Sequence, residues 1–206
     1  MKVDFSPFEG IGCIECGKQS PLYKLGCLSI AKNELLGGFT PVYPIAGCGY
    51  FFEEIEGTED IGSVDLSVEC LSYIATINGV LCSRLVIFKD SNYLLVKNFD
   101  ELRTLFAPVD SPQEALSFSL ATSNYSAEYG QTVNSKYVYS VSEVEDTFVE
   151  TIADGYLVHL FYTPSAGCGP FNTEAIEVKV TFDGYLQEMN RYPIYRDPSN
   201  DNLCVD

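Results

Sequence analysis

The chain has 206 residues, of which 46% are hydrophobic and 20% are charged, and its formal net charge is −17. This composition is typical of a globular protein with a sizeable core and excludes intrinsic disorder. The acidic charge repels phosphate backbones, so we expect no nucleic-acid partner. No apolar run approaches the roughly 18–20 residues of a membrane-spanning helix, so we expect no membrane span.

The cysteine content indicates an oxidising compartment. There are eight cysteines and one histidine, and an even cysteine count of this size is typical of disulfide-bonded proteins. The first residues, Met1–Glu9, lack the apolar core of a signal peptide. We therefore expect an extracytoplasmic protein (secreted, periplasmic or at the cell surface) whose leader or lipid anchor is absent from the sequence given. A cytosolic protein with reduced thiols is the alternative.

Residues 1–62 carry few periodic signals and many glycines, prolines and cysteines. Such a composition predicts a loop-rich region with short strands that is supported by disulfides. The apolar segment Leu22–Leu36 is compatible with a short helix or a short strand, and the sequence does not decide between them.

The next stretch predicts a β-hairpin and a third strand. Val64–Ile77 is rich in β-branched and aromatic residues, Asn78-Gly79 is a strong turn signal, and Val80–Phe88 is the predicted return strand. Tyr93–Val96 is the predicted third strand, following a turn at residues 90–92.

This hairpin predicts which cysteines cannot pair. With a two-residue turn at Asn78-Gly79, Cys82 faces Ala75 and Cys70 faces Ile87. The two cysteines are then five positions out of register, or roughly 17 Å along the strand. Because a disulfide needs a much shorter Cα separation, we expect no bond between Cys70 and Cys82.

A short helix is predicted to separate two regions. Asn98 is a good N-cap with Glu101 at capping-box spacing, and Pro108 ends the helix. We place a cysteine-rich β region at residues 1–97 and a helix-plus-antiparallel-sheet domain at residues 98–206. The apolar residues of this helix indicate that it packs, and the alternative is that the two regions share one core.

The clearest helix in the sequence covers Ser111–Thr122. Ser111 can cap the free backbone N–H groups, Pro112 suits the first helical position, and Glu114 lies at capping-box spacing. The residues that follow give a broad apolar surface: Ala115, Leu116, Phe118, Leu120 and Ala121. The helix should therefore lie against another element.

A series of predicted strands follows this helix. They are Lys136–Val144, Thr147–Ile152, Tyr156–Tyr162, Glu174–Phe182 and Tyr185–Met189. Alternation puts Ile176, Val178 and Val180 on one face of the sheet, which the helix can cover. The predicted fold class is α+β and mainly antiparallel, with a helix packed on a four- to five-stranded meander.

Residues 111–190 resemble the cystatin-like and PepSY-type α+β modules in their helix-then-meander topology and their strand-Asp-Gly-strand turns. Gln131-Thr-Val-Asn-Ser135 resembles the cystatin inhibitory pattern Gln-x-Val-x-Gly, with Ser135 in place of the glycine. The resemblance implies a binding or inhibitory module, and it makes Gln131 and Val133 a candidate binding loop. Protease inhibition is therefore one alternative function.

The cysteines are candidates for structural disulfides. Cys13-Ile-Glu-Cys16 has a spacing that is also used by zinc and redox sites, but the second paired motif of a zinc site and the βαβ context of a redox site are missing. In the second half only Cys168 and Cys204 carry thiols, so this pair is favoured. The full set of disulfide candidates is Cys13, Cys16, Cys27, Cys48, Cys70, Cys82, Cys168 and Cys204.

The repeated tetrapeptide Ala-Gly-Cys-Gly, at residues 46–49 and 166–169, has two interpretations. The two copies could form matched loops of one site, or they could be two separate disulfide turns. The second interpretation is favoured because no longer repeat surrounds them.

The only histidine, His159, alternates with Leu157 and Phe161 on one face of a strand, as a packed side chain would. The sequence has no P-loop, dinucleotide-binding or serine-hydrolase motif, and its acidic pairs lack EF-hand spacing. We therefore expect no cofactor and no metal. The predicted function is a non-enzymatic binding or structural module for an unknown protein or small ligand. The alternative is a small hydrolase or thiol enzyme that uses His159 or a free cysteine.

Overall fold

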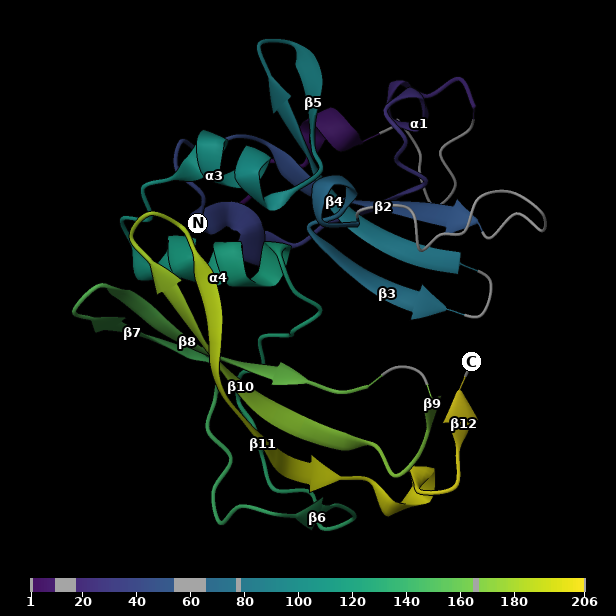
Figure 1. The fold of residues 1–206 in the computed structure, drawn as a ribbon, viewed down its shortest axis with the longest axis vertical. Coiled ribbons are helices and arrows are strands. Elements are labelled where there is room, and N and C mark those ends of the chain that lie inside the picture. The colour runs from purple at the N-terminus through teal and green to yellow at the C-terminus, as the bar shows by residue number, and fades with distance from the viewer. Residues whose placement is uncertain (1, 10–17, 54–65, 77–78, 165–166, 206) are drawn as a thin grey trace.

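The structure of the protein is a computed structural model. It describes residues 2–9, 18–53, 66–76, 79–164 and 167–205. Figure 1 shows two antiparallel sheets, one in the upper and one in the lower half of the view, with the helix α4 (Pro112–Ala121) between them. The predicted α+β class is confirmed. None of the helices in the described part of the chain has the length and apolar character needed to cross a membrane.

The first sheet has the order β1-β2-β4-β3, and β5 also pairs with β4. Its strands are β1 (Ser29–Ala31), β2 (Ile45–Glu53), β3 (Ser72–Thr76), β4 (Gly79–Lys89) and β5 (Asn92–Val96). The segment that the sequence left undecided contains three short elements in succession: α1 (Pro21–Lys24), β1 and the 3₁₀ helix η2 (Glu34–Gly38). A further 3₁₀ turn, η1, covers Ser6–Phe8.

The second sheet has the order β6-β11-β10-β8-β7, so its last four strands form the predicted meander. The strands are β6 (Val138–Tyr139), β7 (Phe148–Ile152), β8 (Gly155–Tyr162), β10 (Asn172–Thr181) and β11 (Leu186–Arg196). A small ribbon of β9 (Gly167–Cys168) and β12 (Cys204–Val205) holds the C-terminus, and η4 (Pro198–Asn200) precedes it.

The predicted strand from Val64 to Ile77 is wrong in its first part. The helix α2 (Leu66–Glu69) comes before β3, and the strand register places Tyr73, and not Ala75, opposite Cys82. Gly79 already pairs with Thr76 in the hairpin, while the predicted turn residue Asn78 lies outside the described residues.

This helix also overturns the predicted exclusion of a Cys70–Cys82 disulfide. The two cysteines are bonded, with a Cα–Cα distance of 5.4 Å. The buried Arg84 donates from Nε to the Glu69 carbonyl at 2.7 Å and from Nη2 to the Glu69 carboxylate at 2.8 Å. Arg84 thus fixes the end of α2, and Cys70 leaves the strand path and lies beside Cys82.

The turn before the third strand is confirmed. Lys89 pairs with Asn92, so Asp90 and Ser91 form a two-residue loop. Their φ angles are 51° and 62°, the combination that a type I′ hairpin turn requires. Aspartate tolerates this conformation better than most residues.

The predicted strand Lys136–Val144 is wrong over most of its length, because only β6 pairs, with the end of β11. The chain from residue 140 to residue 146, here called the strap, crosses the outer face of the second sheet. Val141 and Val144 pack there on a small cluster formed by Phe161, Ala175 and Ile194. The strap buries its valines against this face instead of extending the sheet.

The two long helices begin where predicted. The Asn98 side chain accepts a hydrogen bond from the Glu101 N–H at the start of α3 (Phe99–Phe106), and Ser111 accepts one from the Glu114 N–H at the start of α4 (Pro112–Ala121). Residues 114–119 of α4 are all buried, so this helix is enclosed on more than one side.

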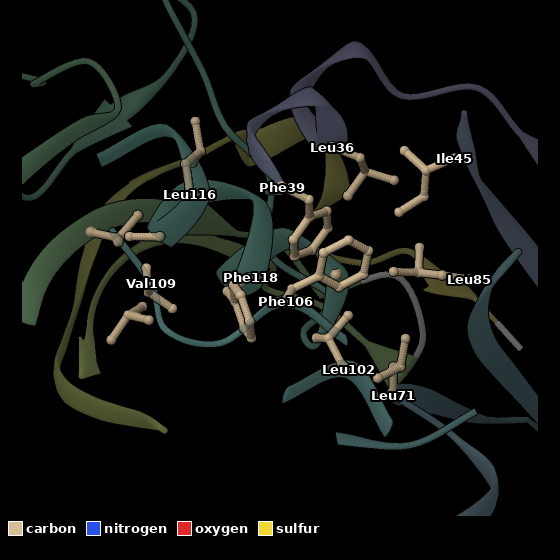
Figure 2. Packing of buried hydrophobic residues seen from close by; sticks show 14 of the residues in the cluster. Leu36, Phe39, Ile45, Leu71, Leu85, Leu102, Phe106, Val109, Leu116 and Phe118 are labelled. Atoms are coloured by element: carbon tan, nitrogen blue, oxygen red, sulfur yellow. The ribbon is translucent and has the colours of Figure 1, made fainter. Parts of the chain in front are cut away.

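The main core lies around α4 and draws on both halves of the chain. Ile176, Val178 and Val180 of β10 pack beneath the helix, as predicted. Phe39, just after η2, stacks on Phe106 with ring centroids 4.4 Å apart (Figure 2). The cluster also includes Leu36, Ile45, Leu85, Leu102, Val109, Leu116 and Phe118.

We predict that a fragment of residues 98–206 does not fold cooperatively. Removal of residues 1–97 exposes the side of α3 and α4 that Leu36, Phe39 and Ile45 cover in the intact chain. Urea denaturation followed by circular dichroism should give a sigmoidal transition for the full chain and a gradual slope for the fragment. A cooperative transition of the fragment, with a dispersed NMR spectrum, would show that it is autonomous.

Candidate functional site

A cleft of about 620 Å³ lies between the two sheets, beyond the end of α4. One wall is formed by α2 and the start of β3, and the other by the inner face of the second sheet. The lining residues are Leu66, Ser67, Cys70, Leu71, Ser72, Tyr73, Phe99, Thr122, Ser123, Asn124, Tyr125, Tyr162, Leu186 and Arg191. Asn124 joins the two walls, since its Nδ2 donates to the Tyr73 carbonyl at 2.9 Å.

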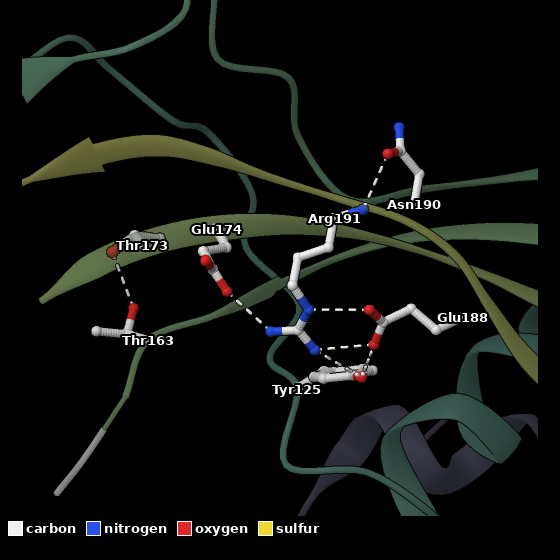
Figure 3. A network of polar contacts seen from close by, with 7 residues as sticks. All are labelled: Tyr125, Thr163, Thr173, Glu174, Glu188, Asn190 and Arg191. Carbon is white, nitrogen blue, oxygen red and sulfur yellow. Dashed lines mark hydrogen bonds and ion pairs between the residues drawn. The ribbon is translucent and has the colours of Figure 1, made fainter. Parts of the chain in front are cut away.

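The second-sheet wall is the part of the inner face that α4 leaves uncovered. Arg191 lies opposite Ile176 in the strand register, and Glu188 lies opposite Val178. Both partners belong to the core face, so Arg191 and Glu188 extend from the same side of the sheet as the core. Figure 3 shows their side chains meeting Tyr125 there.

A β-bulge brings these two side chains to the same face. Asn190 pairs with Glu177 and Glu188 pairs with Val178, so Met189 is an extra residue in β11. In a regular strand, residues three apart point to opposite faces. The extra residue reverses this relation for Glu188 and Arg191.

Arg191 is the centre of a polar network (Figure 3). Its Nε and Nη2 donate to the two carboxylate oxygens of Glu188 at 2.9 and 2.8 Å, and its Nη1 donates to Glu174 at 2.8 Å. The Tyr125 hydroxyl donates to Glu188 at 2.6 Å and accepts from Arg191 Nη2 at 3.2 Å. Two hydrogen bonds from one guanidinium to the same carboxylate fix the guanidinium in one orientation.

The network shifts the pKa values of Glu188 and Tyr125. Hydrogen bonds from Arg191, and then from Tyr125, lower the pKa of Glu188 to about 2. Burial, followed by the hydrogen bond to Glu188, raises the pKa of Tyr125 to about 12. At neutral pH Glu188 is therefore a carboxylate and Tyr125 a neutral phenol.

Aromatic rings provide the remaining surface of the wall. Tyr125 and Tyr162 meet edge to face with centroids 6.1 Å apart, and the Arg191 guanidinium lies 5.2 Å from the Tyr162 ring centroid. Tyr73 on the opposite wall is 51% exposed. The cleft thus combines ring faces with hydroxyl and amide groups.

The six described cysteines form three disulfides. Cys168 and Cys204, the pair favoured from the sequence, are bonded with an S–S distance of 2.02 Å. The others are Cys27–Cys48 and Cys70–Cys82. No cysteine in the described part of the chain is free. Cys13 and Cys16 lie outside the described residues, so their predicted role stays a prediction.

The repeated Ala-Gly-Cys-Gly tetrapeptide belongs to two separate sheets. Residues 46–49 lie inside β2, where Cys48 is buried, whereas Cys168 lies in the exposed ribbon of β9 and β12. Ala166 lies outside the described residues. The described residues of the two copies therefore belong to two independent disulfide sites.

The predicted binding loop lies away from the cleft. Gly130 and Gln131 donate their N–H groups to the Asp146 carboxylate, each at 2.9 Å. Val133 is 74% exposed. Neither Gln131 nor Val133 lines the cleft.

His159 is a packed side chain, 1% exposed, on the outer face of the second sheet. Its ring stacks on Phe148 at 5.0 Å and meets the edge of Phe161 at 5.3 Å. Burial lowers its pKa. Because Cys168 is held in a disulfide, it cannot serve as a nucleophile for this histidine.

Sequence reasoning missed every member of the Arg191 network. The predicted final strand ended at Met189, which left Arg191 outside any element. A β-bulge leaves no periodic pattern in the sequence from which it could be predicted. The hydrogen bond between Tyr125 and Glu188 joins residues that are 63 positions apart. Among the described residues, no group of three histidine, cysteine, aspartate or glutamate side chains could hold a metal ion.

A scan against protein-family models and searches of curated proteins and solved structures found no match to this chain. The resemblance of residues 111–190 to cystatin-like and PepSY-type modules therefore stays a prediction.

We predict that the network stabilises the fold above about pH 4.5 and that this contribution is lost as the pH falls towards 2. A carboxyl group whose pKa is lower in the folded than in the unfolded chain contributes stability only when it is ionised. NMR titration of the Glu188 carboxyl should give a pKa near 2 in the native chain. In Arg191→Gln it should rise towards the ordinary value for glutamate, whereas the control Arg103→Gln should leave it unchanged. A Glu188 pKa that is insensitive to Arg191→Gln would contradict the network.

Proposed function

We propose that this protein is a non-enzymatic, extracytoplasmic binding module that holds an extended segment of a protein partner in the cleft between its sheets. The proposal rests on one observation. The edge strand β3 lies across the cleft from a wall that contains tyrosine rings and an ordered arginine. Tyrosine and arginine are the residues that most often dominate protein interfaces.

Strand β3 supports an extended ligand. It is the last strand in the order of the first sheet, so one of its edges has no strand neighbour among the described residues. The Tyr73 carbonyl accepts a hydrogen bond from outside the first sheet, donated by Asn124. Edge strands of this kind bind extended peptides through main-chain hydrogen bonds, while pockets select the side chains.

The charge of the cleft restricts its ligand. The guanidinium of Arg191 is already paired with Glu188 and Glu174, and the chain as a whole has a net charge of −17. We therefore expect the bound segment to carry aromatic or apolar anchors without acidic groups. Because the network holds Tyr125 and Arg191 in place before binding, little side-chain entropy is lost on association.

The disulfides support the proposed compartment. Three intramolecular disulfides in the described residues are typical of proteins that mature under oxidising conditions. One of them, Cys70–Cys82, secures the cleft wall formed by α2 and β3.

The test is a peptide-display selection against the full chain, followed by NMR mapping of an enriched synthetic peptide. We expect amide shifts at residues 72–74, 124–125, 162 and 191. Tyr73→Ser and Tyr162→Ala should each weaken binding at least tenfold, because each removes a ring from a cleft wall. Tyr129→Ala is the matched control, since Tyr129 is 56% exposed and lies outside the cleft.

Two results would reject the proposal. One is a selection from which no peptide is enriched. The other is an enriched peptide whose binding depends on Tyr129 as much as on Tyr73 and Tyr162.

Protease inhibition through the loop at Gln131 and Val133 is the second candidate function, favoured by the exposure of Val133. It predicts inhibition of papain that Val133→Asp abolishes, because a charge replaces the exposed apolar contact. The control is Val138→Asp, a change of another exposed valine in the following strand. Absence of inhibition at micromolar protein concentrations would end this candidate.

A further inference from the structure

A second cavity, of about 150 Å³, lies on the opposite side of the second sheet from the cleft. Its roof is the strap, and its floor is formed by strand residues His159, Tyr192 and Ile194. The strap is held at one end by the Ser140 N–H, which donates to the Ile194 carbonyl at 2.7 Å. Near its other end, Thr147 donates its N–H to the Glu128 carbonyl at 2.8 Å.

The floor of this cavity contains an unpartnered polar side chain. His159 is 1% exposed, and neither of its ring nitrogens has a hydrogen-bond partner in the described part of the chain. A buried polar group without a hydrogen-bond partner destabilises the folded chain. Phe148 and Phe161 fix the ring from two sides, so the imidazole is held in place with its hydrogen-bonding capacity unused.

The cavity also carries negative charge. Glu143 and Glu145 of the strap line it, and their charges are opposed by no lysine or arginine in the lining. Glu177 lies directly beside His159 on the neighbouring strand. Glu145 and Glu177 both act electrostatically on His159 and on Tyr192.

These features define the chemistry of a ligand. A neutral imidazole offers one acceptor and one donor, and the surrounding carboxylates accept hydrogen bonds and favour a positive charge. A cavity of this size holds a group of only a few heavy atoms. A metal ion is less suitable, because the described residues bring no three metal-ligating side chains together.

We propose that this cavity is a binding site for a small primary ammonium group, which donates one hydrogen bond to the His159 ring and is neutralised by Glu145. The site is independent of the proposed peptide cleft. The two lie on opposite faces of the second sheet and share no lining residue.

The experiment is a titration of the full chain with methylammonium chloride at pH 7.5 and low ionic strength. His159 is the only histidine, so its imidazole ¹⁵N resonances can be read without ambiguity. We expect a saturable shift of these resonances. Tetramethylammonium, which has the same charge but no N–H donor, should shift them much less.

Glu145→Gln tests whether the Glu145 carboxylate neutralises the ligand. The change leaves the fold intact, because Glu145 is exposed. It should weaken methylammonium binding at least fivefold. Glu150→Gln is the matched control, since Glu150 is an exposed glutamate of β7 that does not line the cavity. His159→Phe keeps a packed ring but has no imidazole signal, so its binding is read from the backbone amides of residues 143–145. Their saturable shift with methylammonium should be abolished.

Three results would overturn the proposal. The first is an imidazole signal that does not respond to methylammonium. The second is an equal response to tetramethylammonium, which would indicate charge screening alone. The third is equal weakening by Glu145→Gln and Glu150→Gln. None of these results bears on the peptide cleft, which is tested with different residues.

Discussion

The close approach of η2 to α4 is the contact on which the rest of the structure depends. Gly38 lies so near the helix that an added Cβ would be 2.1 Å from the Gln113 carbonyl oxygen. Ser117 fixes this approach, since its hydroxyl accepts from the Gly38 N–H at 3.0 Å and donates to the Leu35 carbonyl at 2.7 Å. Only glycine allows backbone to pack on a helix at this distance. Because the other side of α4 covers β10, one ten-residue helix joins the N-terminal segment to the second sheet.

Glu114 secures the same junction with a buried carboxyl group. Its side chain is fully buried, and its two carboxylate oxygens accept the N–H groups of Thr40 and Asp110, each at 2.9 Å. Burial raises the pKa of Glu114, and the two hydrogen bonds oppose that rise. A buried carboxylate is tolerated only where such donors converge on it. Glu114 therefore links the connection between η2 and β2 to the connection between α3 and α4, and so helps to set the relative position of the two cleft walls.

The sequence predicted the elements whose signals are local. The caps at Asn98 and Ser111, the turn at residues 90–92 and the alternation of β10 depend on neighbouring residues, and all are present. The errors occurred where a distant contact decided the local conformation. Arg84 determines where α2 ends, and so allows the Cys70–Cys82 bond that a regular hairpin forbids. Likewise, Lys136–Val144 is rich in tyrosine and valine, as a strand would be, but the valines of the strap pack on a neighbouring sheet face. The candidate cleft depends wholly on contacts of this second kind, which is why none of its network was predicted.

The bulge at Met189 gives the second sheet two different uses. Before the bulge, Glu188 lies opposite Val178, and after it Arg191 lies opposite Ile176, so both charged side chains point to the core side where α4 ends. The inner face thus changes from packing surface to cleft wall within one strand. The outer face, with His159, is covered by the strap and has no contact with α4. A ligand in the cleft would touch walls from both sheets, whereas a ligand under the strap would touch one sheet only. Since a ligand stabilises the structure that it requires, the first should strengthen the junction at α4 and the second should not.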